Sequence, residues 1–173
     1  FGGPAVQVDW PRNFRAPAVL EVPDCELEIL WGERYQIDAR DCVLRNEQLE
    51  LTARARFVGN EGKPFVDVNV AAPRLALAEL QDFWPESVIK PKVSDWLRRA
   101  IRAGTARNAR FSLVGDMDEF PFAGGQGRLE ASFDFTEGRL AYQPGWPEAE
   151  GVEARAHFVN TAMALEGSIG SMG

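Results

Sequence analysis

Apolar and polar side chains alternate along most of this chain. Every second residue is apolar in QLELTARARFV (residues 48–58), and the same pattern recurs in CELEILW (25–31), PFVDVNV (64–70), RLEASFDF (128–135) and VEARAHFV (152–159). Alternation with a period of two is typical of antiparallel strands that have one dry face and one solvated face. The turn signals GNEGKP, AGGQG, TEG and PGWPEAEG separate these segments. The sequence therefore predicts a mainly β protein built as an antiparallel meander.

One segment, PKVSDWLRRAIRA (91–103), follows a helical period instead. Its apolar positions have the spacing of a single helix face: Val93, Trp96, Leu97 and Ile101. Pro91 suits the first helical position, and Gly104 suits a left-handed stop after the last turn. A helix of about three turns is too short to be stable alone in water, so we expect its apolar stripe to pack on the sheet.

The charge of the chain is unevenly distributed. The net charge of −7 argues against a nucleic-acid-binding protein. Residues 89–110 nevertheless contain seven basic residues and one acidic residue, Asp95. No run of 18 apolar residues occurs, so we expect no membrane-spanning helix in this piece. The chain begins with FGGPAV and ends with GSIGSMG, and we expect residues 1–173 to be a single segment of a longer protein.

The two cysteines lie in CELEILWGERYQIDARDC (25–42), which predicts a hairpin folding back near WGER. A four-residue loop there would place Cys25 opposite Cys42, close enough for a disulfide in an oxidising compartment. Two free, half-buried thiols are the alternative.

Residues that could support catalysis or bind a metal are sparse. His157 is the only histidine, and it falls on the polar side of its strand. The acidic residues of GDMDEF (115–120) lack the glycine and later glutamate of a calcium loop, and AGGQG precedes a strand rather than the helix that a phosphate cradle needs. We therefore expect no enzyme activity, no metal site and no cofactor.

Four stretches together resemble a known family: LRNEQLELTARARF (44–57), GKPFVDVNV (62–70), WPESVIKPKVSDWLRRAIRAGTARNARFSLVGDMDEFPF (84–122) and GRLAYQPGWPEAEGVEARAHFVN (138–160). The order of the WL helix, the FPF turn and the YxPxWP motif is similar to that of the AsmA-like superfamily, in its YhdP branch. The resemblance covers most of the chain, from Leu44 onward and more loosely before it.

The resemblance implies a fold and a function. Members are large periplasmic proteins of Gram-negative bacteria, anchored in the inner membrane, and resemble the chorein-type bridge proteins. Their antiparallel strands curl into an open groove (a half-barrel or taco-like sheet) with an apolar floor. The groove is implied to carry phospholipid between the inner and outer membranes. This segment would then contact acyl chains and the adjoining groove segments, and the membrane only through regions outside it.

On this interpretation, the apolar strand faces line the groove. The expected lining residues are Leu49, Leu51, Phe57, Val66, Val68, Leu129, Phe133, Phe135 and Phe158. The helix would pack over the groove edge, with Arg98, Arg99 and Arg102 facing outward or toward phosphate headgroups. The alternative is that the helix closes one end of the core and that these arginines pair with the acidic surface.

Two other functions remain open from the sequence. One is a closed β-sandwich that acts as an interaction or ligand-binding module, because strands of this kind commonly pack into sandwiches. The other is a structural spacer with no ligand. Exposed strand edges would also favour an edge-to-edge dimer of the fragment.

Overall fold

The computed structural model describes residues 5–8, 18–47, 49–59, 62–78, 91–120, 122–160 and 162–172. Its strands are β1 (Ala5–Val8), β2 (Ala18–Trp31), β3 (Tyr35–Arg45), β4 (Glu50–Gly59), β5 (Phe65–Ala76), β6 (Ile101–Asp116), β7 (Arg128–Leu140), β8 (Ala149–Val159), β9 (Ala162–Ser168) and β10 (Ser171–Met172). The helix α1 (Pro91–Ala100) lies between β5 and β6 in the sequence.

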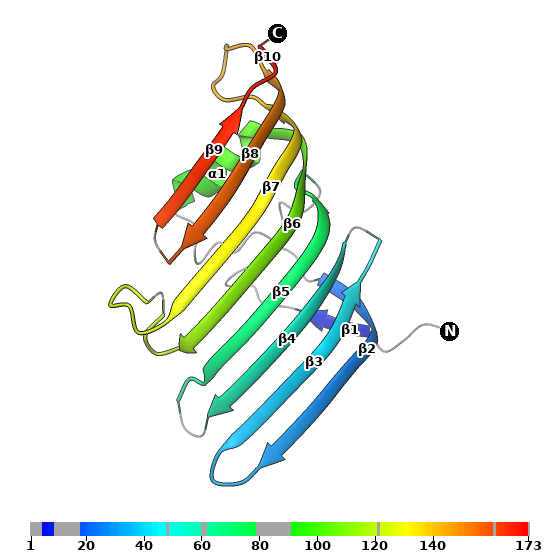
Figure 1. Cartoon of the computed structure of the whole chain (residues 1–173), viewed down its shortest axis with the longest axis vertical. Coiled ribbons are helices and arrows are strands. Elements are labelled where there is room, and N and C mark those ends of the chain that lie inside the picture. Colours follow the sequence, from blue (N-terminus) through cyan, green and yellow to red (C-terminus); the bar gives the residue numbers. More distant parts are fainter. Residues whose placement is uncertain are drawn as a thin grey trace.

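All described strands form one open antiparallel sheet in which chain neighbours are mostly sheet neighbours. The order is β1-β2-β3-β4-β5-β6-β7-β8-β10, and β9 also pairs with β8. Figure 1 shows the strands side by side from β2 to β9. The predicted meander is confirmed. The described residues do not form a closed sandwich, because they make a single sheet.

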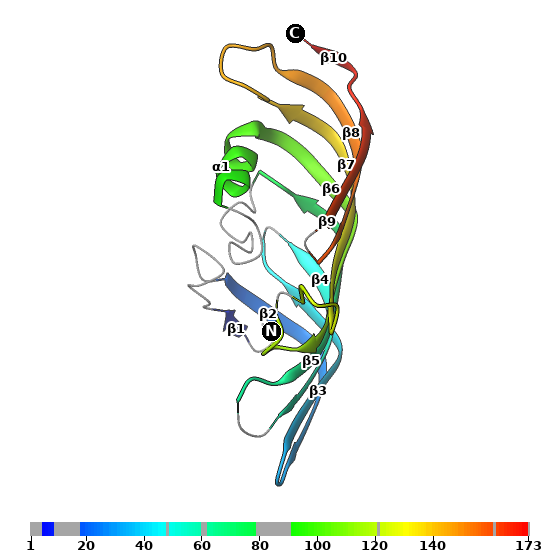
Figure 2. The same cartoon turned by 90° about the vertical axis from the view of Figure 1, so that its left-hand side faces the viewer.

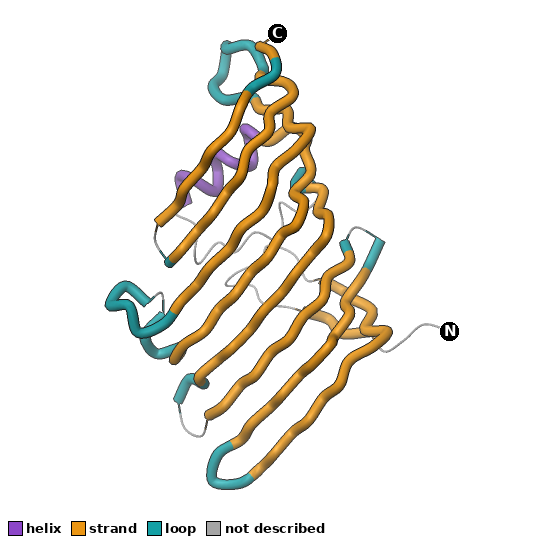
Figure 3. Tube along the Cα trace, viewed as in Figure 1, coloured by secondary structure: helices purple, strands orange, loops and turns teal. Residues whose placement is uncertain are grey.

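The sheet is bowed, and α1 lies on the inner side of the bow (Figure 2). In Figure 3 the helix, coloured purple, lies behind the orange strands. We call the side that faces α1 the inner face and the opposite side the outer face.

Strand register assigns the alternating residues to these two faces. Phe57 lies opposite Val66, and Val66 lies opposite Gly115, on the inner face. One residue away, Arg56 lies opposite both Asp38 and Asp67, on the outer face. Because paired residues point to the same side of a sheet, the apolar half of each strand joins the apolar half of its neighbours.

Bulges keep this pattern in phase along strands that are long and curved. The register shifts between Ala39 and Cys42 in β3, near Asn108 in β6 and near Glu137 in β7. The extra residues include Asp41, Asn108 and Glu137, each with a positive φ of 49–56°. A bulge adds one residue and bends its strand, so the apolar residues on both sides of it stay on the inner face. The prediction of a turn at TEG (136–138) is wrong, because these residues form the bulge inside β7.

The helix ends three residues earlier than the sequence predicts. Ile101 is the first residue of β6 and pairs with Leu140 of β7, so it does not belong to the helical stripe. Gly104, predicted to stop the helix, lies inside β6 with a φ of +143°. Strand pairing with β7 competes with the helical pattern here and takes over after Ala100.

Phenylalanine rings cover the two ends of the inner face on β6 and β7. Phe122 is 1% exposed and rests on Gly115 and Gly127, where an added Cβ would approach the ring to 2.8 and 2.5 Å. At the other end, Phe135 is 7% exposed and packs with Ala149 and Val152. Partly buried side chains complete this second cluster: Leu77, Phe133, Leu140 and Ala154.

Candidate functional site

The inner face forms an apolar floor that crosses the sheet from β2 to β9. Ile29 lies opposite Ile37, and Ile37 lies opposite Phe57. Farther along, Val68 faces Leu113, and Leu113 faces Leu129. Small and large side chains alternate between strands, as in the pairs Phe111–Ala131, Ala131–Phe158 and Phe133–Ala156. The described residues of this face therefore form a continuous apolar surface.

Every residue that the sequence predicted to line the groove belongs to this floor. Val66, Leu129 and Phe135 are buried. The other six are half-buried: Leu49, Leu51, Phe57, Val68, Phe133 and Phe158. Leu49 precedes β4 and joins the floor through an isolated bridge to Leu75. The rings of Phe133 and Phe158 stack with centroids 6.3 Å apart. Whether these side chains contact lipid stays a prediction.

The sequence-based selection missed several members of the floor. They are Leu27, Ile29, Val70, Phe111, Leu113, Met163 and Leu165. Phe111 and Leu113 carry the same alternation within ARFSLVG (109–115), shortly after the expected helix. The pattern was therefore present, but only the strand register joins these positions to the others.

The floor is uncovered at its two lateral ends. Trp31, on β2, is 84% exposed, and Met163 and Leu165, on β9, are each 62% exposed. Trp31 follows Leu27 and Ile29 on the apolar side of β2, yet no described residue covers it apart from its stacking with Tyr35. Exposed apolar surface of this kind is typical of interaction surfaces.

The extent of the match to known proteins decides the family. A model of the family described as YhdP protein matches residues 4–173. The chain belongs to the YhdP family. A curated relative from Escherichia coli (strain K12), the "Intermembrane phospholipid transporter YhdP", is 24% identical over 158 residues. That alignment covers 88% of this chain and 12% of the relative, so the chain spans about an eighth of the relative's length. No solved structure matches it.

The outer face of this YhdP-family chain is polar, and many of its charged side chains pair with one another. Arg56 Nε lies 2.8 Å from Asp38 Oδ1, and Arg155 Nε lies 2.9 Å from Asp134 Oδ1. The hydrogen bond from Arg56, helped by one from Gln36, lowers the pKa of the buried Asp38 carboxyl. Hydrogen bonds from Asn108 and Arg155 lower the pKa of Asp134 in the same way.

Glu130 is the centre of another outer-face group. Arg128 Nε donates to its Oε2 at 2.8 Å, and His157 Nε2 lies 2.6 Å from its Oε1. These bonds lower the pKa of Glu130 from 4.5 to about 2. His157 is thus an exposed partner of a surface carboxylate.

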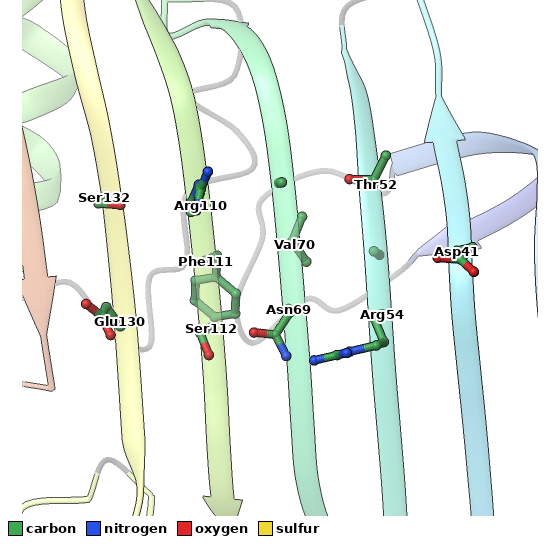
Figure 4. Close-up of a pocket in the computed structure, with 12 residues that line it drawn as sticks. Asp41, Thr52, Arg54, Asn69, Val70, Arg110, Phe111, Ser112, Glu130 and Ser132 are labelled. Carbon is green, nitrogen blue, oxygen red and sulfur yellow. The ribbon is translucent and has the colours of Figure 1, made fainter.

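A hollow of about 680 Å³ lies on the outer face across β3 to β7 (Figure 4). Its polar side chains come from neighbouring strands: Asp41, Thr52, Arg54, Asn69, Arg110, Ser112, Glu130 and Ser132. These side chains mix both signs of charge with hydroxyl and amide groups. The hollow therefore does not suit acyl chains, and the apolar floor on the opposite face remains the candidate site.

The helix docks on the upper end of the inner face. Ala100 is fully buried, and Trp96 and Leu97 are half-buried. Trp96 Nε1 donates to the backbone oxygen of Tyr142 at 3.1 Å, which ties α1 to the loop between β7 and β8. The side chain of Val93, also predicted to pack, lies outside the described part of the structure.

The three arginines predicted to reach headgroups do not lie on one element. Arg98 and Arg99 belong to the last turn of α1, whereas Arg102 belongs to β6. Arg102 Nε lies 3.8 Å from Glu148, so for Arg102 the structure agrees with the alternative of an internal acidic partner. Arg99 Nε donates to the backbone oxygen of Asp95 at 3.2 Å.

Cys25 and Cys42 form a disulfide between β2 and β3. Trp31 pairs with Tyr35, so the hairpin loop has three residues rather than the four expected. The register passes from Glu26–Arg40 to Asp24–Val43, and this shift brings Cys42 opposite Cys25. The bulge at Asp41, rather than the loop, therefore aligns the two cysteines.

Within the described ranges, no three His, Cys, Asp or Glu residues come together in a way that could hold a metal ion. Over the same residues, no helix is long and apolar enough to cross a membrane.

Proposed function

We propose that this chain forms one section of a conduit that shelters phospholipid acyl chains on its inner face. The observation that carries the proposal is the continuous apolar floor, which is uncovered at both lateral ends. Membership of the YhdP family and the name of the relative, an intermembrane phospholipid transporter, support it. A surface that only shelters apolar chains needs no catalytic group, so the proposed role is non-enzymatic.

The dimensions of the floor suit this role. The strands that cross it contain 10 residues in β4 and 16 in β6. At about 3.3 Å per residue they span roughly 33–53 Å, at least as long as the roughly 30 Å of hydrocarbon that the two leaflets of a bilayer form. Each methylene moved from water to an apolar surface contributes about 0.8 kcal/mol, so even partial cover of an acyl chain would hold it on the floor.

The open ends of the floor suit continuation by other strands. β9 pairs with β8 along one side, and beyond Glu21 the described part of β2 pairs only with β3. We infer that adjoining segments of a longer, inner-membrane-anchored periplasmic protein extend the floor and provide the membrane contacts. In isolation, the same edges would pair two copies of the chain edge to edge.

Photo-crosslinking tests the proposal directly. A photoreactive benzoylphenylalanine would replace Phe133, on the inner face, or Ser132, the next residue on the outer face. Each protein would be mixed with vesicles of phosphatidylethanolamine and phosphatidylglycerol, irradiated and analysed by mass spectrometry. We expect phospholipid adducts at position 133 and none at position 132.

The two positions distinguish the alternatives. Adducts at neither position would support the structural spacer and overturn the proposal. Equal adducts at both positions would indicate non-specific adsorption to the vesicles, and would also overturn it.

A further inference from the structure

An aromatic cluster stands at the upper rim of the inner face, where the floor ends. It consists of Trp96 on α1 and of Tyr142 and Trp146 in the loop between β7 and β8. The centroids of Trp96 and Tyr142 are 5.7 Å apart with the rings nearly perpendicular, and those of Tyr142 and Trp146 are 6.4 Å apart. The hydrogen bond from the Trp96 indole to the Tyr142 backbone oxygen fixes the cluster on the helix.

Two of the three residues of the cluster are exposed although they are large and aromatic. Tyr142 is 59% exposed and Trp146 is 56% exposed. Figure 2 shows α1 and the β7–β8 loop on the same side of the sheet. Just below them lie Leu140 and Phe135, which belong to the buried end of the floor. Within a few residues, the surface thus changes from the apolar floor to exposed Tyr and Trp side chains. These two side chains favour the boundary between hydrocarbon and headgroups.

Cations flank this cluster on the helix. Lys92, Trp96 and Arg99 occupy positions i, i+4 and i+7, so they share one side of α1. Lys92 and Arg99 are exposed, and neither forms an ion pair with a carboxylate among the described residues. Lys92 and Arg99, which have no carboxylate partner among the described residues, place positive charge beside the aromatic cluster in a chain of net charge −7, and such a local positive charge attracts an anion.

We propose that Lys92, Arg99, Trp96, Tyr142 and Trp146 form a rim site that binds the phosphodiester headgroup of a phospholipid whose acyl chains lie on the floor. The cations contact the phosphate, and the aromatic rings pack against the glycerol region. This inference rests on the proposed function. It adds a site for the polar headgroup, the part of the lipid that the apolar floor does not recognise. It assigns the headgroup to Lys92 and Arg99 rather than to Arg102, which already faces Glu148.

Calorimetric titration of the 173-residue chain with short-chain probes tests the rim site. The probes are dihexanoylphosphatidylglycerol, dihexanoylglycerol without a phosphate, and glycerol 3-phosphate without acyl chains. We expect the phospholipid to bind about tenfold more tightly than dihexanoylglycerol, as charge-assisted contacts at an exposed site allow. Glycerol 3-phosphate should bind far more weakly, because it lacks the acyl chains.

Matched variants assign the effect to the rim. The double variant Lys92→Gln/Arg99→Gln should raise the Kd for the phospholipid to that for dihexanoylglycerol and leave the latter unchanged. Arg54→Gln/Arg110→Gln removes the same charge from the outer face, where these arginines also lack an ion pair among the described residues, and should change neither Kd. Tyr142→Ala/Trp146→Ala should weaken phospholipid binding about fivefold.

The outcomes separate this inference from the proposed function. Equal binding of both acyl probes, with no effect of the rim variants, would overturn the rim site and leave the floor intact. Glycerol 3-phosphate binding as tightly as the phospholipid would show a free-phosphate site, and would also overturn it. No binding of either acyl probe would contradict the proposed function itself. Thermal unfolding within about 2 °C of wild type would show that each variant is folded.

Discussion

The ring of Phe135 lies directly over Gly104 in the neighbouring strand. A Cβ at position 104 would collide with the Cε2 and Cζ atoms of that ring, and φ at this glycine is +143°. Gly138, in the strand of Phe135 itself, meets the other edge of the same ring. Glycine at 104 and 138 is therefore what allows Phe135 to lie flat and seal the upper end of the floor.

We expect Gly104→Ala to destabilise the chain by about 2–4 kcal/mol, because it combines backbone strain with a collision in a packed cluster. Gly145→Ala is the matched control, since its φ is +81° but nothing lies within 4 Å of an added Cβ. That control should lower the free energy of unfolding only through backbone strain, by about 1 kcal/mol. Urea unfolding measures both values, and equal losses would show that the ring does not constrain position 104.

The contact between Arg56 and Asp38 predicts a second stability effect. Asp38 is 6% exposed and accepts hydrogen bonds from Arg56 and Gln36. Arg56→Met would leave a buried carboxylate without its cation, so the free energy of unfolding should fall. Arg54→Met, two residues along the same face, removes an arginine with no ion pair among the described residues and should have little effect.

A double-mutant cycle checks that explanation. In an Asp38→Asn background, Arg56→Met should lower the free energy of unfolding by less than it does in wild type, because the uncompensated charge is gone. Equal costs in the two backgrounds would mean that Arg56 acts through packing alone.

Glu130 predicts how stability changes with pH. Its pKa is about 2 in the folded chain, against 4.5 for the ordinary carboxyl. A lowered folded-state pKa stabilises the fold above pH 4.5, and this contribution is lost as the pH falls from 4.5 toward 2. Asp38 and Asp134 shift in the same direction and add to the loss.

Unfolding in urea between pH 6 and pH 2 measures this dependence. Glu130→Gln should be less stable than wild type at pH 6 and should lose less stability on acidification. Glu153→Gln, at an exposed carboxylate of β8 with no ion pair among the described residues, should keep the wild-type slope. A wild-type slope in Glu130→Gln would show that its partners do not stabilise the folded state.

The disulfide joins residues 17 apart in sequence. Closing a loop of that size in the unfolded chain stabilises a protein by about 3 kcal/mol. We therefore expect Cys25→Ala/Cys42→Ala to lower the urea midpoint, and reduction of wild type to lower it by a similar amount. A thiol-alkylating reagent should leave the untreated chain unmodified. Modification without prior reduction would contradict the pairing.

The alternating segments allowed the meander and its apolar face to be predicted because a period of two is local. Leu49, Phe57, Val66 and Phe133 could each be assigned to a dry side from their immediate neighbours. Phe111 and Leu113 show the same alternation, but the sequence does not state which strands they join. Register with Val70, Val68 and Leu129 decides that, and register depends on contacts between residues far apart in the chain.

The helix boundary and the TEG segment show what local pattern cannot decide. Ile101 fits the helical stripe, yet pairing with Leu140 makes it the start of a strand. Glu137 and Gly138 have the composition of a turn, yet they form a bulge because β7 continues to pair with β6 and β8. In both places hydrogen bonds to neighbouring strands outweigh a local preference worth about 1 kcal/mol or less.

The sequence by itself determined that the strands have one apolar side and that one basic helix interrupts them. Only the tertiary structure decided that these sides join into an open floor rather than a closed core, and that Trp96, Tyr142 and Trp146 meet at its rim. The reason is physical: alternation sets which way each side chain points. Whether a second layer covers the apolar side depends on how the bulged strands bend and on what remains to pack against them.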